Sequence, residues 1–101
     1  MGPWVGAEFL GLSDAEAALI EMKLSLSRCL RERRQRRGVS QMELAKRLHS
    51  SQSRVAKMEA GDPSVSMDLL VSSLLVLGVS PADLAKTIRR GEGGRGRHAA
   101  A

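Results

Sequence analysis

The sequence predicts an all-α fold, on three observations. Apolar residues recur at helical spacing, serines suited to helix N-caps precede most of these apolar segments, and glycines follow several of them. No stretch shows the alternation of apolar and polar residues that is typical of a strand. With 101 residues, 43% of them hydrophobic, the chain is long enough for one compact domain with an aliphatic core.

A long first helix is predicted over residues 13–37. Ser13 and Glu16 have the spacing of a capping box, and Gly38 follows where the helix should end. Ile20 and Leu24 lie off the core stripe and add surplus apolar surface. The stripe that we expect to face the core consists of Leu19, Met22, Leu26, Cys29 and Leu30.

Four shorter helices are predicted over residues 41–48, 52–60, 67–77 and 81–88. Their N-caps are expected to be Ser40, which forms a capping box with Glu43, then Ser51, Ser66 and Ser80. Gly61 and Gly78 mark two of the helix ends. Surplus apolar residues on the third of these helices are Leu69, Leu75 and Val76. The residues expected to face the core are Leu44, Ala45, Leu48, Val55, Met58, Met67, Leu70, Val71, Leu74, Leu77, Leu84 and Ile88.

Both ends of the chain are predicted to lie outside the folded domain, which then spans residues 13–88. Residues 1–12 contain three glycines and a proline and are expected to form a flexible lead-in. Residues 89–101 contain four glycines, four arginines and no core residue, so they are expected to form a disordered basic tail.

The charge is unevenly distributed along the chain. The net charge is +5, and residues 28–37 hold six arginines against one acid, whereas residues 1–21 hold four acids and no base. A basic cluster on a helix is typical of a protein that binds a polyanion, although a solvated helix face has the same composition. Trp4 and Phe9 are the sole aromatic residues, so modules that stack bases on aromatic side chains are disfavoured.

Catalytic and metal-binding functions find little support. Cys29, His49 and His98 lack the spacing of metal ligands, and the glycines match no phosphate-binding loop. We therefore expect no enzyme activity, metal or cofactor, and interpret Cys29 as a packed thiol. A single cysteine, an acidic N-terminus and the lack of a membrane-length apolar run predict a soluble cytoplasmic protein.

The segment over residues 40–64, SQMELAKRLHSSQSRVAKMEAGDPS, predicts a helix-turn-helix. Its two helices are separated by only three residues, so they must cross steeply, which leaves the second helix free to enter a major groove. Glutamine pairs well with adenine, while lysine and arginine reach guanine or phosphate. The outward residues of the second helix are Gln52, Ser53, Arg54, Ala56 and Lys57.

Over residues 30–84 the sequence resembles the lambda-repressor-like, XRE-type helix-turn-helix family. The motifs that carry the resemblance are LRERRQRRGVSQMELAKRL, SSQSRVAKMEAGDPS and LGVSPADL. It implies a five-helix lambda-repressor-like domain, here with an extended first helix. It also implies a partly buried structural ion pair between Arg34 and Glu59.

The resemblance further implies the DNA-contacting residues. Gln41 would touch a phosphate at the start of its helix. Gln52, Ser53 and Lys57 occupy the base-contacting positions, and Arg54 lies beside them where either a phosphate or a base is in reach.

Three features depart from the family pattern. His49 replaces the glycine usual in the turn, where φ is commonly positive, so we expect mild strain there. Arg33 stands where leucine is frequent, which predicts a more exposed first helix. The N-terminal part of the first helix lies outside the minimal domain.

Three functions follow as hypotheses. The first is a transcription regulator, namely a homodimeric repressor of a double-stranded DNA operator. The second is an antitoxin, because residues 6–34 resemble the leader and first helix of XRE-type antitoxins of the host-inhibition-of-growth kind; residues 1–30 would then bind a toxin protein. The third is an adaptor without DNA binding, which the basic first helix and the absence of acids before Glu59 in its helix disfavour.

Overall fold

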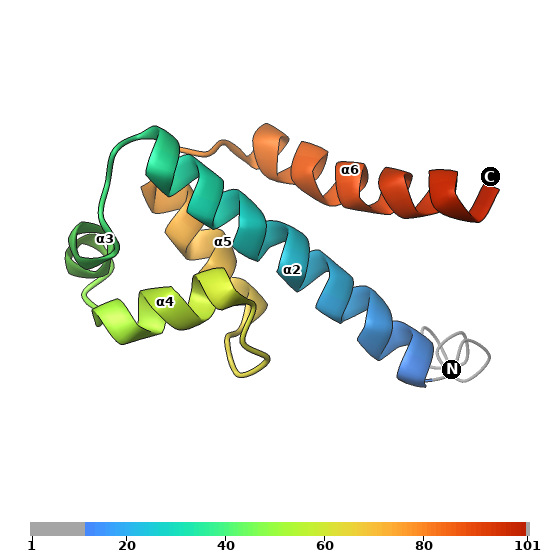
Figure 1. Ribbon diagram of the computed structural model, residues 1–101, viewed down its shortest axis with the longest axis horizontal. Coiled ribbons are helices and arrows are strands. Elements are labelled where there is room, and N and C mark those ends of the chain that lie inside the picture. The colour runs from blue at the N-terminus through green and yellow to red at the C-terminus, as the bar shows by residue number, and fades with distance from the viewer. Residues whose placement is uncertain (1–11, 101) are drawn as a thin grey trace.

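The computed structural model describes the backbone of residues 12–100 and the side chains of residues 13–90. This part of the chain contains helices and no strand, so the all-α prediction is confirmed (Figure 1). None of its helices is both long and apolar enough to cross a membrane. The helices are α2 (Leu12–Arg36), α3 (Gln41–Arg47), α4 (Gln52–Ala60), α5 (Met67–Val76) and α6 (Pro81–Ala100).

Helix α2 is the central element of the arrangement. Helices α4, α5 and α6 contact α2, whereas α3 packs on α4. Helices α3 and α4 lie on one side of α2 and α6 lies on the other (Figure 1). In this view α3 is seen nearly end-on and α4 from the side, so the two helices cross steeply, as the short turn between them predicts.

Serine caps fix the starts of the four helices after α2. In each case the serine Oγ accepts a hydrogen bond from the backbone N–H three residues later, which satisfies one of the orphan donors of the first turn. Each such cap contributes about 1 kcal/mol to stability. The caps are Ser40 (3.0 Å), Ser51 (3.2 Å), Ser66 (3.1 Å) and Ser80 (3.1 Å).

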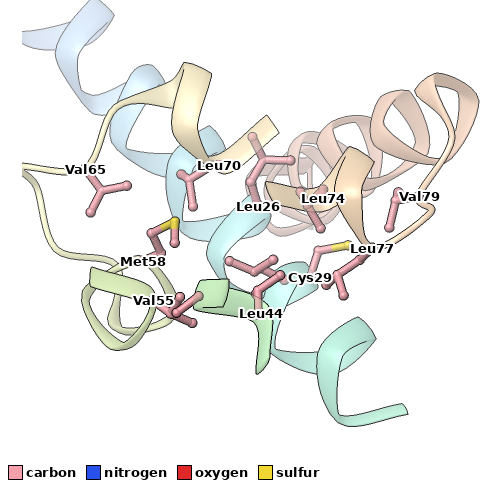
Figure 2. Close-up of a cluster of buried hydrophobic side chains, with 12 residues drawn as sticks. Leu26, Cys29, Leu44, Val55, Met58, Val65, Leu70, Leu74, Leu77 and Val79 are labelled. Atoms are coloured by element: carbon pink, nitrogen blue, oxygen red, sulfur yellow. The ribbon is translucent and has the colours of Figure 1, made fainter. Parts of the chain in front are cut away.

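The predicted core is largely confirmed (Figure 2). Side chains from α2, α3, α4 and α5 meet in one cluster, and residues of α6 pack against its edge. Two loop residues, Val65 and Val79, also belong to the core, and no periodicity marked them. The buried hydrophobic residues are Leu26, Cys29, Leu30, Leu44, Ala45, Val55, Met58, Val65, Leu70, Leu74, Leu77 and Val79; those partly buried around them include Leu48, Met67, Val71, Leu84 and Ile88.

The prediction that Leu19 belongs to the core is wrong. Leu19 is 45% exposed, and every residue from 13 to 20 is exposed. The apolar stripe of α2 continues toward the N-terminus beyond the helices that pack on it. Helical periodicity identifies the stripe, but it does not reveal where the covering helices end.

The last helix is longer than predicted. Helix α6 continues past Ile88 to Ala100, so residues 89–100 are helical and the prediction of a disordered tail there is wrong. A glycine in a helix costs about 1 kcal/mol relative to alanine but keeps its N–H donor, unlike proline. The first helix begins at Leu12, one residue before the predicted cap Ser13. The predicted flexible lead-in lies outside the described residues except for Leu12.

Helices α2 and α6 are joined by polar as well as apolar contacts. Arg33, expected to be exposed, is half-buried and forms an ion pair with Asp83, with an N–O distance of 3.9 Å. The Thr87 hydroxyl donates to the carbonyl of Asp83 and lies 3.6 Å from the Cys29 sulfur. Cys29 is buried, as a packed thiol should be.

Gly61 ends α4 in a conformation that favours glycine. Its φ is +76°, and a Cβ at this position would lie 2.6 Å from Cδ2 of Leu24 on α2. Gly38 has a similar φ of +68°, but a Cβ there would meet nothing within 4 Å. Substituting each glycine by alanine therefore distinguishes the cost of the left-handed backbone, present at both positions, from the cost of close packing, present only at Gly61.

We predict that Gly61→Ala lowers the free energy of unfolding more than Gly38→Ala does. Gly38→Ala should cost about 1 kcal/mol for the left-handed backbone alone. Gly61→Ala should cost more than this, because the end of the Leu24 side chain must also move to make room. Urea denaturation of both variants measures the difference, and equal losses would contradict the close packing of α4 against α2.

Candidate nucleic-acid interface

The chain turns sharply between α3 and α4, within the four residues that separate the two helices. The N–H of His49 bonds to the carbonyl of Lys46, and that of Ser50 bonds to the carbonyl of Ala45 at 2.8 Å. His49 has a φ of +53°, so the predicted left-handed conformation is confirmed. Ser51 is extended and caps α4. This turn sets the steep crossing of the two helices.

Helix α4 is held by one face and leaves the other free. Val55 and Met58 are fully buried, and the buried Ser73 hydroxyl, which lies 3.4 Å from the Met58 sulfur, donates to the carbonyl of Leu69. The four predicted DNA-contacting residues of this helix are all exposed: Gln52, Ser53, Arg54 and Lys57.

A groove runs along α4 on the side of the α4–α5 loop. Ser53 and Lys57 are four residues apart and so share one face of α4, and Arg54 lies beside them. These three side chains line the groove together, whereas Gln52 is not among its lining residues. The opposite wall is formed by Ser64, Val65, Ser66 and Leu69, at the start of α5.

The groove is suited to an anion such as a phosphate. Arg54 and Lys57 supply positive charge, and the N-termini of α4 and α5, capped by Ser51 and Ser66, border it. The sequence predicted the α4 wall but did not single out Ser64 and Ser66 as lining residues. The sequence feature that could have indicated them is the preceding Asp-Pro pair, which is typical of a turn and places both serines in the loop before α5.

The loop that forms the second wall is held in place by Asp62. Its Oδ1 accepts hydrogen bonds from the backbone N–H and the hydroxyl of Ser64, at 2.8 and 2.7 Å. These bonds lower the pKa of Asp62, and the charges of Lys57 and Lys23 lower it further. Lys23 on α2 also donates to the carbonyl of Pro63 at 3.0 Å.

The predicted ion pair between Arg34 and Glu59 is confirmed. The Nε of Arg34 donates to Oε2 of Glu59 and the second guanidinium nitrogen donates to Oε1 at 2.9 Å, so the pair is bidentate. The side chains are only 12% and 4% exposed. The hydrogen bonds to Glu59 raise the pKa of Arg34 despite its partial burial. Arg34 also donates to the carbonyl of Val39 at 2.8 Å.

Gln41 makes a contact that the sequence did not predict. Its Nε2 donates to Oε1 of Glu59 at 3.1 Å, so α3 is tied to the same carboxylate as α2. A glutamine amide has two N–H donors, and one remains for a phosphate. The phosphate contact of Gln41 stays a prediction, and the structure adds that Glu59 holds the side chain that would make it.

A helix-turn-helix domain family matches residues 25–87 of the chain. The chain belongs to this family. The match covers the turn, the groove and the Arg34–Glu59 pair, and it is consistent with the resemblance on which the DNA-contacting residues were predicted. The N-terminal half of α2 lies outside it. Comparisons with curated proteins and with solved structures gave no match.

We predict that Glu59→Ala lowers the free energy of unfolding by about 3 kcal/mol, because it leaves Arg34 partly buried without its partner. The matched control is Glu43→Ala. It removes the exposed 3.5 Å pair with Arg47 on α3 and should cost about 0.5 kcal/mol or less. Urea denaturation compares the two. Similar losses in both variants would contradict a structural role for the pair.

A second prediction concerns the acid stability of the α4–α5 loop. Because the pKa of Asp62 is lower in the folded chain than its ordinary 3.8, the stability it contributes is fully present above pH 3.8 and is lost as the pH falls through the lowered value. Asp62→Asn lacks this contribution. The difference in unfolding free energy between wild type and variant should therefore be constant at neutral pH and shrink in strong acid. A difference independent of pH would show that the charge is not involved.

Proposed function

We propose that the protein is a sequence-specific regulator of transcription that binds double-stranded DNA as a dimeric repressor, with α4 in the major groove. The observation that carries this proposal is the exposed polar face of α4 beside a cationic groove. Both belong to a domain of the helix-turn-helix family. The protein acts in this proposal by occupying DNA and not by catalysis.

The side chains of α4 have the chemistry that base recognition needs. Gln52 at the first turn pairs with the N6 and N7 of adenine, and Lys57 reaches the O6 and N7 of guanine. Ser53 bonds to either kind of base. Each good contact of this kind discriminates against the wrong base by about 1–3 kcal/mol.

The phosphates on either side position the helix. Arg54 and the start of α5 face one phosphate through the groove, and Gln41 at the start of α3 faces another. Arg54 and Lys57 are exposed, and each DNA phosphate that they neutralise releases its condensed counterions, so affinity should fall with ionic strength.

In this proposal the protein binds DNA as two copies of the chain. Helix α4 has nine residues and contacts only a few base pairs, so specificity requires two half-sites about 34 Å apart on one face of the DNA. A symmetric homodimer presents two such helices.

A second candidate function is the antitoxin, and one observation favours it. Residues 13–20 of α2 are exposed, carry two large apolar side chains, and lie outside the family match. A toxin protein bound there would cover them. Co-purification of the chain with a small basic ribonuclease-like protein from a neighbouring gene would support this function over the stand-alone repressor.

We predict that the double variant Gln52→Ala/Lys57→Ala loses the preference for its operator while remaining folded. Wild type should bind DNA upstream of its own gene at least about 10³-fold more tightly than a scrambled duplex. The control is Lys86→Ala, which removes an exposed lysine from α6, on the side of α2 away from α3 and α4 (Figure 1). Titrations over a salt series measure both preference and salt dependence.

Two results would count against the proposal. If all duplexes bind equally and salt abolishes all binding, the basic residues form a general polyanion surface. If Lys86→Ala removes the preference as strongly as the double variant, α4 is not the recognition helix.

A further inference from the structure

Residues 13–20 of α2 are exposed, and no other element of the described chain covers them. Leu19 and Ile20 are 45% and 54% exposed. Helix α2 has 25 residues and is about 37 Å long, but the buried residues that it contributes to the core begin at Leu26. Helix α6 diverges from the N-terminal half of α2 along its length (Figure 1). Within the described part of the chain, these residues are therefore uncovered.

Four residues form one face of this half. Glu16, Leu19, Ile20 and Lys23 are spaced i, i+3, i+4 and i+7, which places them on one side of a helix. The two apolar side chains lie in the middle, with an acid toward the N-terminus and a base toward the C-terminus. The hydrogen bond of Lys23 to the carbonyl of Pro63 positions the basic end, and two further ammonium donors remain. We call these four residues the α2 face.

We propose that the α2 face is a homodimer surface on which α2 of a second copy packs antiparallel. A two-fold axis between Leu19 and Ile20 brings the apolar pairs of both copies together. The same axis places Glu16 opposite the partner subunit's Lys23, and Lys23 opposite the partner subunit's Glu16. Two ion pairs then flank a small apolar centre.

The charge pattern argues for a second copy of this chain over another occupant. The face is complementary to itself only in the antiparallel orientation, since a parallel pair would set each charge beside its like. This arrangement needs no residue from outside the face. It also uses a part of α2 that lies outside the family match, so it is a property of this chain.

A rival surface on α5 lacks this complementarity. Leu75 and Val76 are 46% and 43% exposed, similar to the pair on α2. No charged residue lies within four positions of either one in the sequence. Each pair holds two large apolar side chains of similar exposure, but the pairs differ in flanking charge, which makes the α5 pair a suitable control.

The first experiment measures the mass of the full chain by sedimentation equilibrium without DNA. We expect a dimer at micromolar concentration for wild type and for Leu75→Ser/Val76→Ser. We expect a monomer for Leu19→Ser/Ile20→Ser, with a circular-dichroism spectrum at low temperature that matches wild type, because these side chains are outside the core of the single chain. A monomeric wild type overturns the proposal, and so does a dimer that depends on the α5 pair.

The second experiment tests the antiparallel register by exchanging charges. Glu16→Lys and Lys23→Glu should each raise the dimer dissociation constant about tenfold, because each variant sets like charges opposite one another twice. An equimolar mixture of the two variants should associate as tightly as wild type, because both contacts are attractive in the mixed dimer. A mixture that associates no better than the single variants overturns the register.

The inference rests on the proposed function only in its need for a second copy, and the two can fail separately. A dimer that shows no preference among duplexes leaves the α2 face intact and overturns the DNA-binding proposal. A chain that prefers its operator but stays monomeric without DNA, with the α2 face dispensable, overturns the dimer surface alone.

Discussion

The orientation of α4 depends on one carboxylate. Glu59 accepts two hydrogen bonds from Arg34 on α2 and one from Gln41 on α3, while Arg34 also reaches the carbonyl of Val39 in the α2–α3 loop. Apolar contacts between α2 and α4 favour burial without selecting a direction. A bidentate guanidinium–carboxylate pair has a fixed geometry, so it sets how α4 lies against α2. Burying the two charges is costly, and the complete set of hydrogen bonds offsets that cost.

Fixing α4 from inside leaves its outer face available for binding. Val55, Met58 and Glu59 occupy the inward positions, and the four polar residues of α4 proposed to contact DNA are exposed. Both ends of α4 are also fixed: the Ser51 cap begins the helix, and Gly61 in the left-handed conformation ends it. The α4–α5 loop is braced by Asp62 and by Lys23 of α2. A surface built this way presents its side chains with little reorganisation, which lowers the entropic cost of binding.

The features that could be predicted from sequence are those determined within a few residues. A serine cap or a glycine end acts on its own turn of helix, so Ser40, Ser51, Ser66 and Gly61 were identified correctly. The Arg34–Glu59 pair joins residues 25 positions apart and was predicted only through a family resemblance. The contact of Gln41 with Glu59 and the exposure of Leu19 depend on where other helices lie, and no local pattern records that. The helical residues beyond Ile88 were not predicted, because four glycines and the lack of core residues in this segment are typical of a disordered tail.

Helix α2 connects the proposed dimer face to the recognition helix. Ile20 and Arg34 are fourteen positions apart on one continuous helix, a separation of about 21 Å. Helix α2 contains no proline or glycine that would kink it, so it curves at most gently between these positions and carries orientation along its axis. If two copies pair through the α2 face, the direction of each α2 sets the direction of its partner, and Arg34 carries that direction to α4 through Glu59. The spacing of the two recognition helices is then a consequence of one helix and one ion pair in each copy.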